Sequence, residues 1–250
     1  MKNYFRMLLV AAVSTFLLNG PAPASAADEA LMLPGTSISA NVSMLNQYRW
    51  RGLDQSNTQP AIQGGFDLAH TSGLYIGTWM SNVDWGTTKN STELDIYGGY
   101  GFELPGGLGV DLNFTAFEYP GAAASNKYDF EEYGIGLSKD FGVAALSAGF
   151  NYSDEFFGAS GDAQYLQGGL DIGLPVAGVG LSAHVGHQWI DKNATYGVDD
   201  YLDWSVGLTV PVMGVDLGLT YIDTDLEHST VVTTLNGRED VLITSLSKSF

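Results

Sequence analysis

The sequence predicts an all-β protein, a 12-stranded antiparallel transmembrane up-and-down β-barrel. Three observations lead to this fold class. Apolar and polar residues alternate with a period of two along most of the chain, and short turns rich in Gly and Pro alternate with longer polar loops. The N-terminus also resembles a secretory signal, and no later apolar run is long enough for a membrane-spanning helix.

The first 26 residues have the three parts of a signal peptide. Lys2 and Arg6 form a basic region, residues 7–18 are apolar, and Ala24-Ser25-Ala26 provides small residues for cleavage. An apolar run of about 12 residues is short of the ~20 that a helical membrane anchor needs. We therefore expect a cleaved signal peptide at residues 1–26 and a single barrel domain at residues 27–250.

Composition narrows the class of protein further. The formal charge is -18, and loss of Lys2 and Arg6 with the signal peptide makes it -20. A surface this acidic argues against nucleic acid as a partner, because phosphate binding needs Lys and Arg. The chain has no Cys, so an exported protein of this sequence would depend on a closed hydrogen-bonded network rather than on disulfides.

The stretch 92–119 shows the repeating unit most clearly. Apolar and polar residues alternate over 92–103 and again over 108–119, and Leu104-Pro105-Gly106-Gly107 supplies a tight turn between them. We expect an amphipathic hairpin in which five apolar residues face lipid: Leu94, Ile96, Leu108, Val110 and Leu112. The remaining strands are variations of this hairpin.

The elements expected along the chain follow the same alternation. The strands are 37–44, 62–68, 74–83, 92–103, 108–119, 128–139, 143–152, 164–173, 179–190, 202–209, 215–221 and 240–250. Short turns fall at 71–73, 104–107, 140–142, 174–178 and 211–214, and long loops at 51–59, 84–91, 120–126, 153–162, 191–199 and 222–239. The pattern leaves the facing of 74–83 and of 240–250 open.

The sorting of loop lengths favours a membrane barrel over a soluble sandwich. All short turns fall on one side and all long loops on the other, as in bacterial outer-membrane proteins, whose strands of about ten residues cross the bilayer at a tilt. Aromatic residues also gather at strand ends, which predicts bands at the membrane interfaces. On the long-loop side these are Tyr48, Trp50, Trp85, Tyr119, Tyr128, Tyr152, Trp189, Tyr201, Trp204 and Tyr221, and on the short-turn side Phe102, Phe141 and Phe250.

Several segments of the N-terminal half resemble a known family. They are ISANVS (38–43), QYRWRGLDQS (47–56), QPAIQGGFD (59–67), GTWMSNV (77–83) and ELDIYGGY (93–100). Together they resemble the TorF family of proteobacterial porins. Beyond residue 100 the resemblance depends on the barrel pattern and on the terminal Phe250, which is similar to the assembly signal of outer-membrane proteins. The resemblance implies an outer-membrane barrel and a pore, and it implies no particular solute.

The polar faces of the strands supply the candidate functional residues. If these faces line a water-filled lumen, carboxylates outnumber cations, and the passage should concentrate cations and repel anions. An interior filled by hydrogen-bonded side chains remains the alternative. The predicted pore-lining residues are Arg49, Gln63, Asp67, Glu93, Asp95, Asp111, Asn113, Glu132, Asp171, Asp203 and Asp216.

Catalytic and metal-binding patterns are weak in this chain. His184 and His187 would point to opposite faces of a strand, and no Ser, His and acid residues have the spacing of a hydrolase triad. We therefore predict no enzyme, no cofactor and no metal site. The sequence favours a bacterial outer-membrane channel for passive diffusion of small hydrophilic solutes or ions, surrounded by outer-membrane lipid and lipopolysaccharide. The alternative is a non-conducting structural or adhesive barrel that binds an external partner through its long loops.

Overall fold

A computed structural model describes residues 34–85, 90–176, 178–226 and 239–250 of the chain. The predicted signal peptide, residues 1–26, and most of the predicted loop 222–239 lie outside the described residues. Among the described residues, no helix has the length and apolar character needed to cross a membrane.

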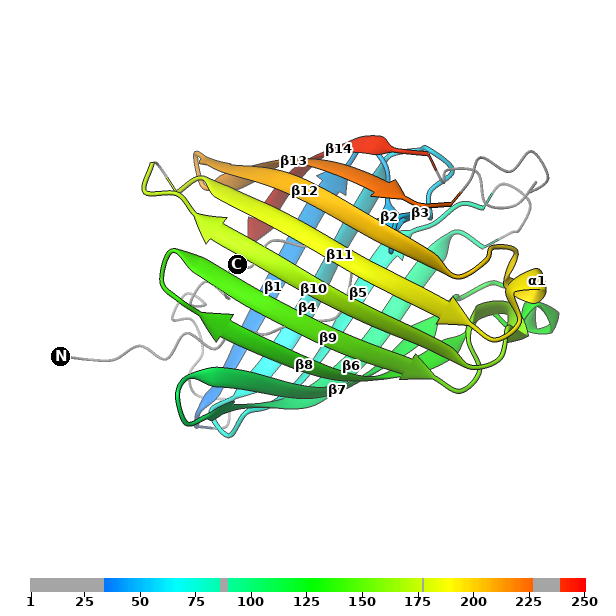
Figure 1. The fold of residues 1–250 in the computed structure, drawn as a ribbon, viewed down its shortest axis with the longest axis horizontal. Helices are drawn as coiled ribbons and strands as arrows, with labels where there is room; N and C mark the ends of the chain where they lie inside the picture. The colour runs from blue at the N-terminus through cyan, green and yellow to red at the C-terminus, as the bar shows by residue number, and fades with distance from the viewer. Residues whose placement is uncertain (1–33, 86–89, 177, 227–238) are drawn as a thin grey trace.

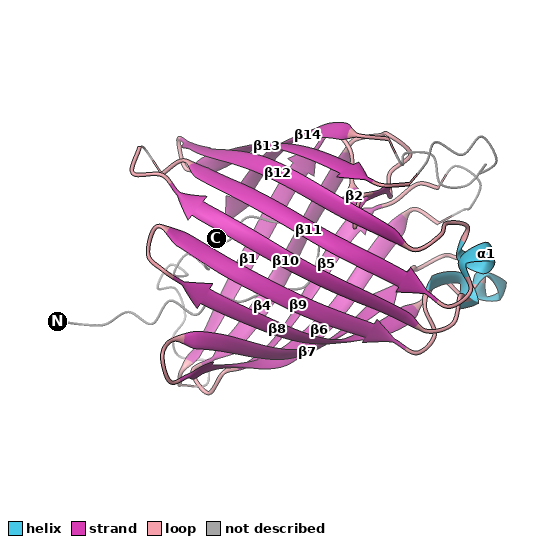
Figure 2. Cartoon of the chain, viewed as in Figure 1, coloured by secondary structure: helices cyan, strands magenta, loops and turns pink. Residues whose placement is uncertain are grey.

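Within the described residues, twelve long strands form one closed antiparallel barrel (Figures 1 and 2). Each strand pairs with the next along the chain, and the pairing of the first strand with the last closes the barrel. This confirms the predicted up-and-down topology. The strands are β1 (Thr36–Leu45), β4 (Ala61–His70), β5 (Leu74–Asn82), β6 (Thr92–Leu104), β7 (Leu108–Glu118), β8 (Phe130–Asp140), β9 (Ala144–Ser153), β10 (Ala163–Gly173), β11 (Gly180–Ile190), β12 (Tyr201–Val212), β13 (Val215–Thr224) and β14 (Val241–Ser249).

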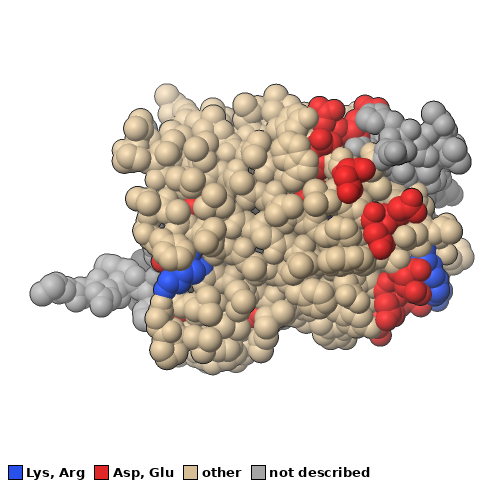
Figure 3. Space-filling model, viewed as in Figure 1, with Lys and Arg blue, Asp and Glu red and all other residues tan. Residues whose placement is uncertain are grey.

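The outer wall of the barrel is apolar. Alternate side chains point outward along each strand, and large apolar ones stay highly exposed, as with Phe66 at 67% and Ile62 at 60%. In Figure 3 the middle of the visible wall carries few charged side chains, while Asp and Glu gather toward the long-loop end. An exposed apolar surface of this extent indicates an interaction surface. On a closed barrel, such a wall is suited to contact with membrane lipid.

The same alternation shows which side chains face inward on the two strands whose facing the sequence pattern leaves open. On β5, Leu74 and Ile76 point outward and are exposed, whereas Tyr75 points inward and is buried. On β14, Leu246 points outward and Ile243 inward. The turn between β6 and β7 also has the predicted form, since Gly106 has φ of 94°, in the left-handed region that favours glycine.

One element differs from the predicted order. Residues 51–59 were expected to form an external loop, but residues 46–60 fold into the barrel and carry two short strands, β2 (Arg49–Trp50) and β3 (Leu53–Asp54), which form a separate two-stranded sheet. We call residues 46–60 the plug hairpin. Three of the other long loops carry short helical turns, at η1 (Ala124–Asn126), η2 (Phe157–Ala159) and α1 (Asn193–Tyr196).

The predicted aromatic band at the long-loop end is wrong for half of its members. Five of its ten members are buried inside the barrel instead of lying at an outer interface: Tyr48, Trp50, Trp85, Tyr119 and Tyr201. The reason is that the inward-folded hairpin offers them an apolar core. At the short-turn end Phe102, Phe141 and Phe250 are exposed on the outside, as predicted.

Candidate functional site

The barrel interior is the candidate functional site. Ten of the eleven predicted pore-lining residues lie on the inward faces of barrel strands, and the eleventh, Arg49, lies inside the barrel on β2 of the plug hairpin. Six of the ten are buried: Gln63, Glu93, Asp95, Asp111, Glu132 and Asp203. The other four, Asp67, Asn113, Asp171 and Asp216, are half-buried. That these side chains line a conducting passage stays a prediction.

Exposure of the inward side chains changes along the barrel axis. On β1, Ser37 near the short-turn end is exposed, Asn41 is half-buried, and Ser43 and Leu45 near the long-loop end are buried. The same gradient follows β6, where Glu103 is exposed and Asp95 has 0% exposure. The interior is therefore open to solvent at the short-turn end, and side chains close it toward the long-loop end.

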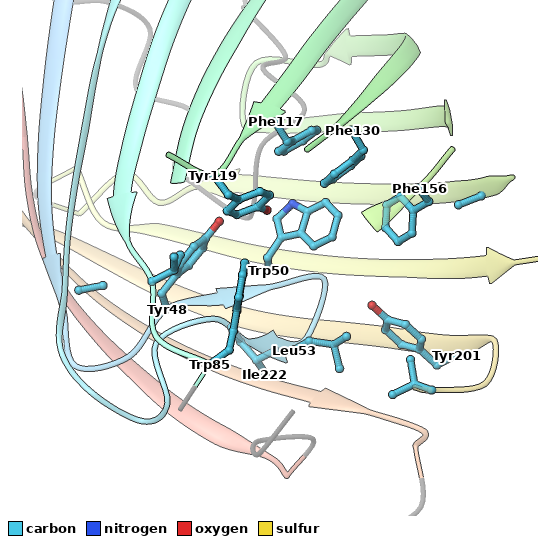
Figure 4. Close-up of a cluster of buried hydrophobic side chains, with 14 of the residues drawn as sticks. Tyr48, Trp50, Leu53, Trp85, Phe117, Tyr119, Phe130, Phe156, Tyr201 and Ile222 are labelled. Atoms are coloured by element: carbon cyan, nitrogen blue, oxygen red, sulfur yellow. The ribbon is translucent and has the colours of Figure 1, made fainter. Parts of the chain in front are cut away.

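An aromatic cluster around the plug hairpin produces this closure (Figure 4). The ring of Trp50 lies 5.7 Å from Phe117, 6.1 Å from Phe130 and 6.1 Å from Phe156, measured between centroids. Phe117 and Phe130 stack on each other at 4.4 Å. Phe117 and Phe130 are paired residues of the adjacent strands β7 and β8, and Phe156 lies in the loop after β9, so Trp50 packs the hairpin against one side of the barrel.

Arg51 fixes the hairpin to the opposite wall by polar bonds. Its Nη2 donates to Glu132 Oε2 at 2.6 Å and its Nη1 to Gln188 Oε1 at 2.7 Å. The guanidinium also lies 4.3 Å from the ring centroid of Trp50 and 4.0 Å from that of Tyr165. Burial by itself would lower the pKa of Arg51, but the Glu132 carboxylate, together with Tyr165 and Tyr201, more than offsets this and leaves the pKa above its ordinary value.

Other contacts seat the rest of the hairpin. The Tyr48 hydroxyl donates to Glu93 Oε1 at 2.8 Å on β6. The Gln55 carbonyl accepts from the Asp84 N–H at 2.8 Å, and Gln55 Oε1 accepts from Trp85 Nε1 at 3.1 Å. The hairpin is thus joined to both β6 and the segment that follows β5.

Asp54 organises the hairpin internally. Its carboxylate accepts from the backbone N–H of Ser56 at 2.9 Å and of Thr58 at 2.7 Å. Burial raises the pKa of Asp54, although these backbone donors and the charge of Arg49 act in the opposite direction. Ser56 Oγ in turn accepts from the Tyr48 N–H at 2.9 Å and donates to the Gln59 carbonyl at 2.7 Å.

We call the interior wall that the plug hairpin covers its seat. The seat holds more carboxylates than cations. Glu93 and Glu132 are bonded to the hairpin through Tyr48 and Arg51, as described above. Asp95 lies two residues from Glu93 on the same face of β6, and neither of its carboxylate oxygens has a hydrogen-bond partner among the described residues. The seat is therefore electrostatically mixed, with one carboxylate held without a donor.

Tyrosine and aspartate side chains pair on the interior wall below the hairpin. Tyr75 donates to both oxygens of Asp111 at 2.9 and 3.0 Å, and Tyr97 donates to Asp67 at 2.5 Å. On the far side, the hydroxyl of Tyr165 donates to Asp203 at 2.9 Å. Tyr75 and Tyr97 position carboxylates toward the short-turn end, whereas Asp203 is buried beside the hairpin, where its Cβ is 3.1 Å from a Cβ built on Gly52.

The tyrosines lie flat on the wall because glycines face them. A Cβ added to Gly186 would come within 2.1 Å of the Tyr165 hydroxyl oxygen, and one added to Gly77 within 2.5 Å of the Tyr97 ring. Glycine at these strand positions therefore provides the room that the rings occupy. His184 Nε2 lies 3.0 Å from Asp203 Oδ1, whereas His187 stacks on outward-facing Trp189. The two histidines point to opposite faces, as predicted.

No group of three or more His, Cys, Asp or Glu side chains in the described parts of the chain is arranged to hold a metal ion.

A family model of bacterial proteins of unknown function, Gcw_chp, matches residues 29–250. The chain belongs to the Gcw_chp family. The matched region includes every strand of the barrel and the plug hairpin. The description of this family does not mention TorF, so the resemblance to that family stays a prediction.

Solved structures similar to this Gcw_chp barrel include porins. The NanC porin aligns with a TM-score of 0.53 and 9% identity over 85% of this chain and 98% of NanC. The KdgM porin aligns with a TM-score of 0.52 and 7% identity over 86% of this chain and 99% of KdgM. A structure of KdgM in complex with disordered oligogalacturonate aligns with a TM-score of 0.51 and 7% identity over the same shares of both chains. At these identities the similarity shows the fold. No curated protein matches the chain.

Sequence reasoning missed Arg51, which falls in an expected external loop, and the inward residues Tyr75, Tyr97, Tyr165 and Gln188. A signal was present in the alternation of Tyr48-Arg49-Trp50-Arg51, which continues the strand pattern past Leu45. The predicted lumen is rich in carboxylates, so an arginine shortly after the first strand is a candidate ion-pair partner for them.

Proposed function

We propose that this Gcw_chp protein is an outer-membrane channel for passive diffusion of small hydrophilic solutes or ions. One observation carries the proposal: a closed barrel with an apolar outside encloses a polar interior whose short-turn half is open to solvent. Barrels of this type have short turns on the periplasmic side and long loops outside the cell. We place the short-turn end in the periplasm and the wall in lipid and lipopolysaccharide.

Cation preference follows from the charges of the interior. Eight of the predicted pore-lining residues are carboxylates and one, Arg49, is a cation. Half-buried Asp67, Asp171 and Asp216 lie in the solvent-open half, where a fixed negative charge raises the local concentration of cations. The two arginines in the plug hairpin have Asp54, Glu239 and Glu132 as acidic neighbours, so they offset charge at the hairpin and leave the three half-buried aspartates uncompensated by them.

Reversal potentials in a planar bilayer under a salt gradient test this proposal. We expect the sign that corresponds to cations, and Asp111→Asn should move the potential toward zero because it removes an interior carboxylate. Glu118→Gln is the matched control, since Glu118 lies on the same strand but points outward and is exposed. A wild-type potential of the anion sign would overturn the cation preference.

The closed long-loop end supports a second candidate function. A barrel sealed by the plug hairpin could serve as a non-conducting structural or adhesive protein whose long loops bind an external partner. The absence of channels over many insertions of correctly folded protein, both in the wild type and in a variant without residues 48–58, would favour this alternative and refute the channel.

A further inference from the structure

We propose that the plug hairpin is a displaceable gate, and that solutes pass the long-loop end only when residues 46–60 leave their seat. This inference rests on the proposed channel function. The position of the hairpin would decide whether the passage is open or closed, because the packed aromatic cluster closes the interior at the level of Trp50.

The two strands of the hairpin lie outside the hydrogen-bond ladder of the barrel, and among the described residues only Asn46 at the base of the hairpin bonds to β14, through Thr244 and Leu242. β2 and β3 pair with each other, through Arg49 with Asp54 and Trp50 with Leu53, and they form a sheet of their own. The barrel closes without them, through the pairing of β1 with β4 and with β14. Displacement of the hairpin therefore leaves the ladder of the wall intact.

Backbone strain is concentrated in the same segment. Six non-glycine residues in the described parts of the chain have positive φ, and three of them lie in the hairpin: Arg51 at 48°, Asn57 at 51° and Thr58 at 60°. Such conformations persist only where the surroundings hold them, and they are found often in switch segments. Arg51 is both strained and bonded to the wall, so release of its bonds also relieves its backbone.

The polar side of the seat favours release. Asp95 has 0% exposure and no donor among the described residues while the hairpin covers it. A buried carboxylate without a partner opposes the closed state, and water can reach it once the hairpin has moved. Displacement uncovers a wall of polar side chains, including Gln63, Glu93, Glu132 and Gln188, that water can solvate.

The apolar side of the seat opposes release. Trp50 packs between Phe117, Phe130 and Phe156, and Arg51 bonds to Glu132. These contacts make the closed arrangement the resting one. The gate then has two sides with opposite preferences, which is what a two-state element requires.

A disulfide staple tests the gate directly. A Cβ built on Gly52 lies 3.8 Å from Cβ of Thr224, the last residue of β13, and this separation is the usual one in a disulfide, about 3.8 Å. Gly52 has φ of 79° and its Cβ would lie 3.1 Å from Cβ of Asp203, so Cys there adds strain that the oxidised and reduced forms share. The chain has no Cys, so Gly52→Cys with Thr224→Cys introduces one pair. We expect the oxidised variant to lose ion flux into liposomes to the level of protein-free vesicles, and reduction by dithiothreitol to restore it. Each single Cys variant is the control and should not respond to redox conditions.

Two further outcomes are distinguishable. Equal flux in the oxidised and reduced staple, at a level above that of protein-free vesicles, would overturn the gate while leaving the channel function in place, because solutes would then pass a seated hairpin. A variant lacking residues 48–58 separates the other case. If that variant and the wild type are both silent although folded, the channel function fails and the gate fails with it. Constant flux through the deletion variant, together with redox-controlled flux through the staple, supports the gate.

Discussion

Replacement of Ile135 by Arg tests whether the outer wall faces lipid. Ile135 is the central residue of β8, an 11-residue strand, and its side chain is 44% exposed on the outside. At about 3.3 Å per residue and a tilt near 40°, such a strand spans about 28 Å, close to the ~25 Å apolar band of outer-membrane barrels. Ile135 then lies near the bilayer midplane, where an Arg costs about 2–4 kcal/mol.

The assay is equilibrium unfolding in urea with the protein inserted in lipid vesicles. Glu131→Arg is the matched control, because Glu131 lies on the same outward face of β8 and about 13 Å along the strand, at the rim. An Arg near the interface costs only about 0–1 kcal/mol. Equal losses at the two positions, or no loss at Ile135, would refute a lipid-facing wall.

A substitution and a deletion test packing and closure of the barrel. Gly186→Ala should lower the free energy of unfolding by about 1–3 kcal/mol, because the new Cβ would overlap Tyr165, whereas Gly180→Ala on the same strand meets only an ordinary contact and should be near neutral in the same urea titration. Deletion of Phe250 removes two backbone hydrogen bonds to Ala40 that close the seam, at 2.9 and 3.2 Å, and should cost about 1–3 kcal/mol and reduce the yield of folded barrel on heat-modified gel mobility. Unchanged yield would mean that the seam closes without these bonds.

Most of the barrel was predictable from local pattern. The alternation over 92–119 gave β6 and β7 with the correct facing, and the Pro105-Gly106 turn gave their connection. Strands are predictable here because each side chain is apolar or polar according to a single environment, lipid or interior. β5 resisted this reading because Tyr75 and Trp79 are apolar residues that face inward, where they contact the wall and the plug hairpin.

The direction of a loop was not predictable in the same way. Residues 46–60 combine aromatic, charged and turn-forming residues, and this composition suits a loop outside the barrel as well as one folded within it. The position of this segment inside the barrel depends on contacts with residues far along the chain, such as those of Arg51 with Glu132 and Gln188. A single sequence places carboxylates on an inward face, but it does not show which of them a loop from another part of the chain will cover.

The connection between the plug hairpin and the seam bears on how the barrel assembles. The hairpin follows β1 directly, and β1 pairs with β14 only when the barrel closes. Its bonds from Arg51 join residues 81 and 137 positions apart, so they add contacts of long sequence separation to a sheet built almost entirely from neighbours. Contacts of this kind form late, because the intervening chain must first be ordered. The interior is therefore closed late in assembly, because the Arg51 bonds form only after the whole sheet has curved around the plug hairpin.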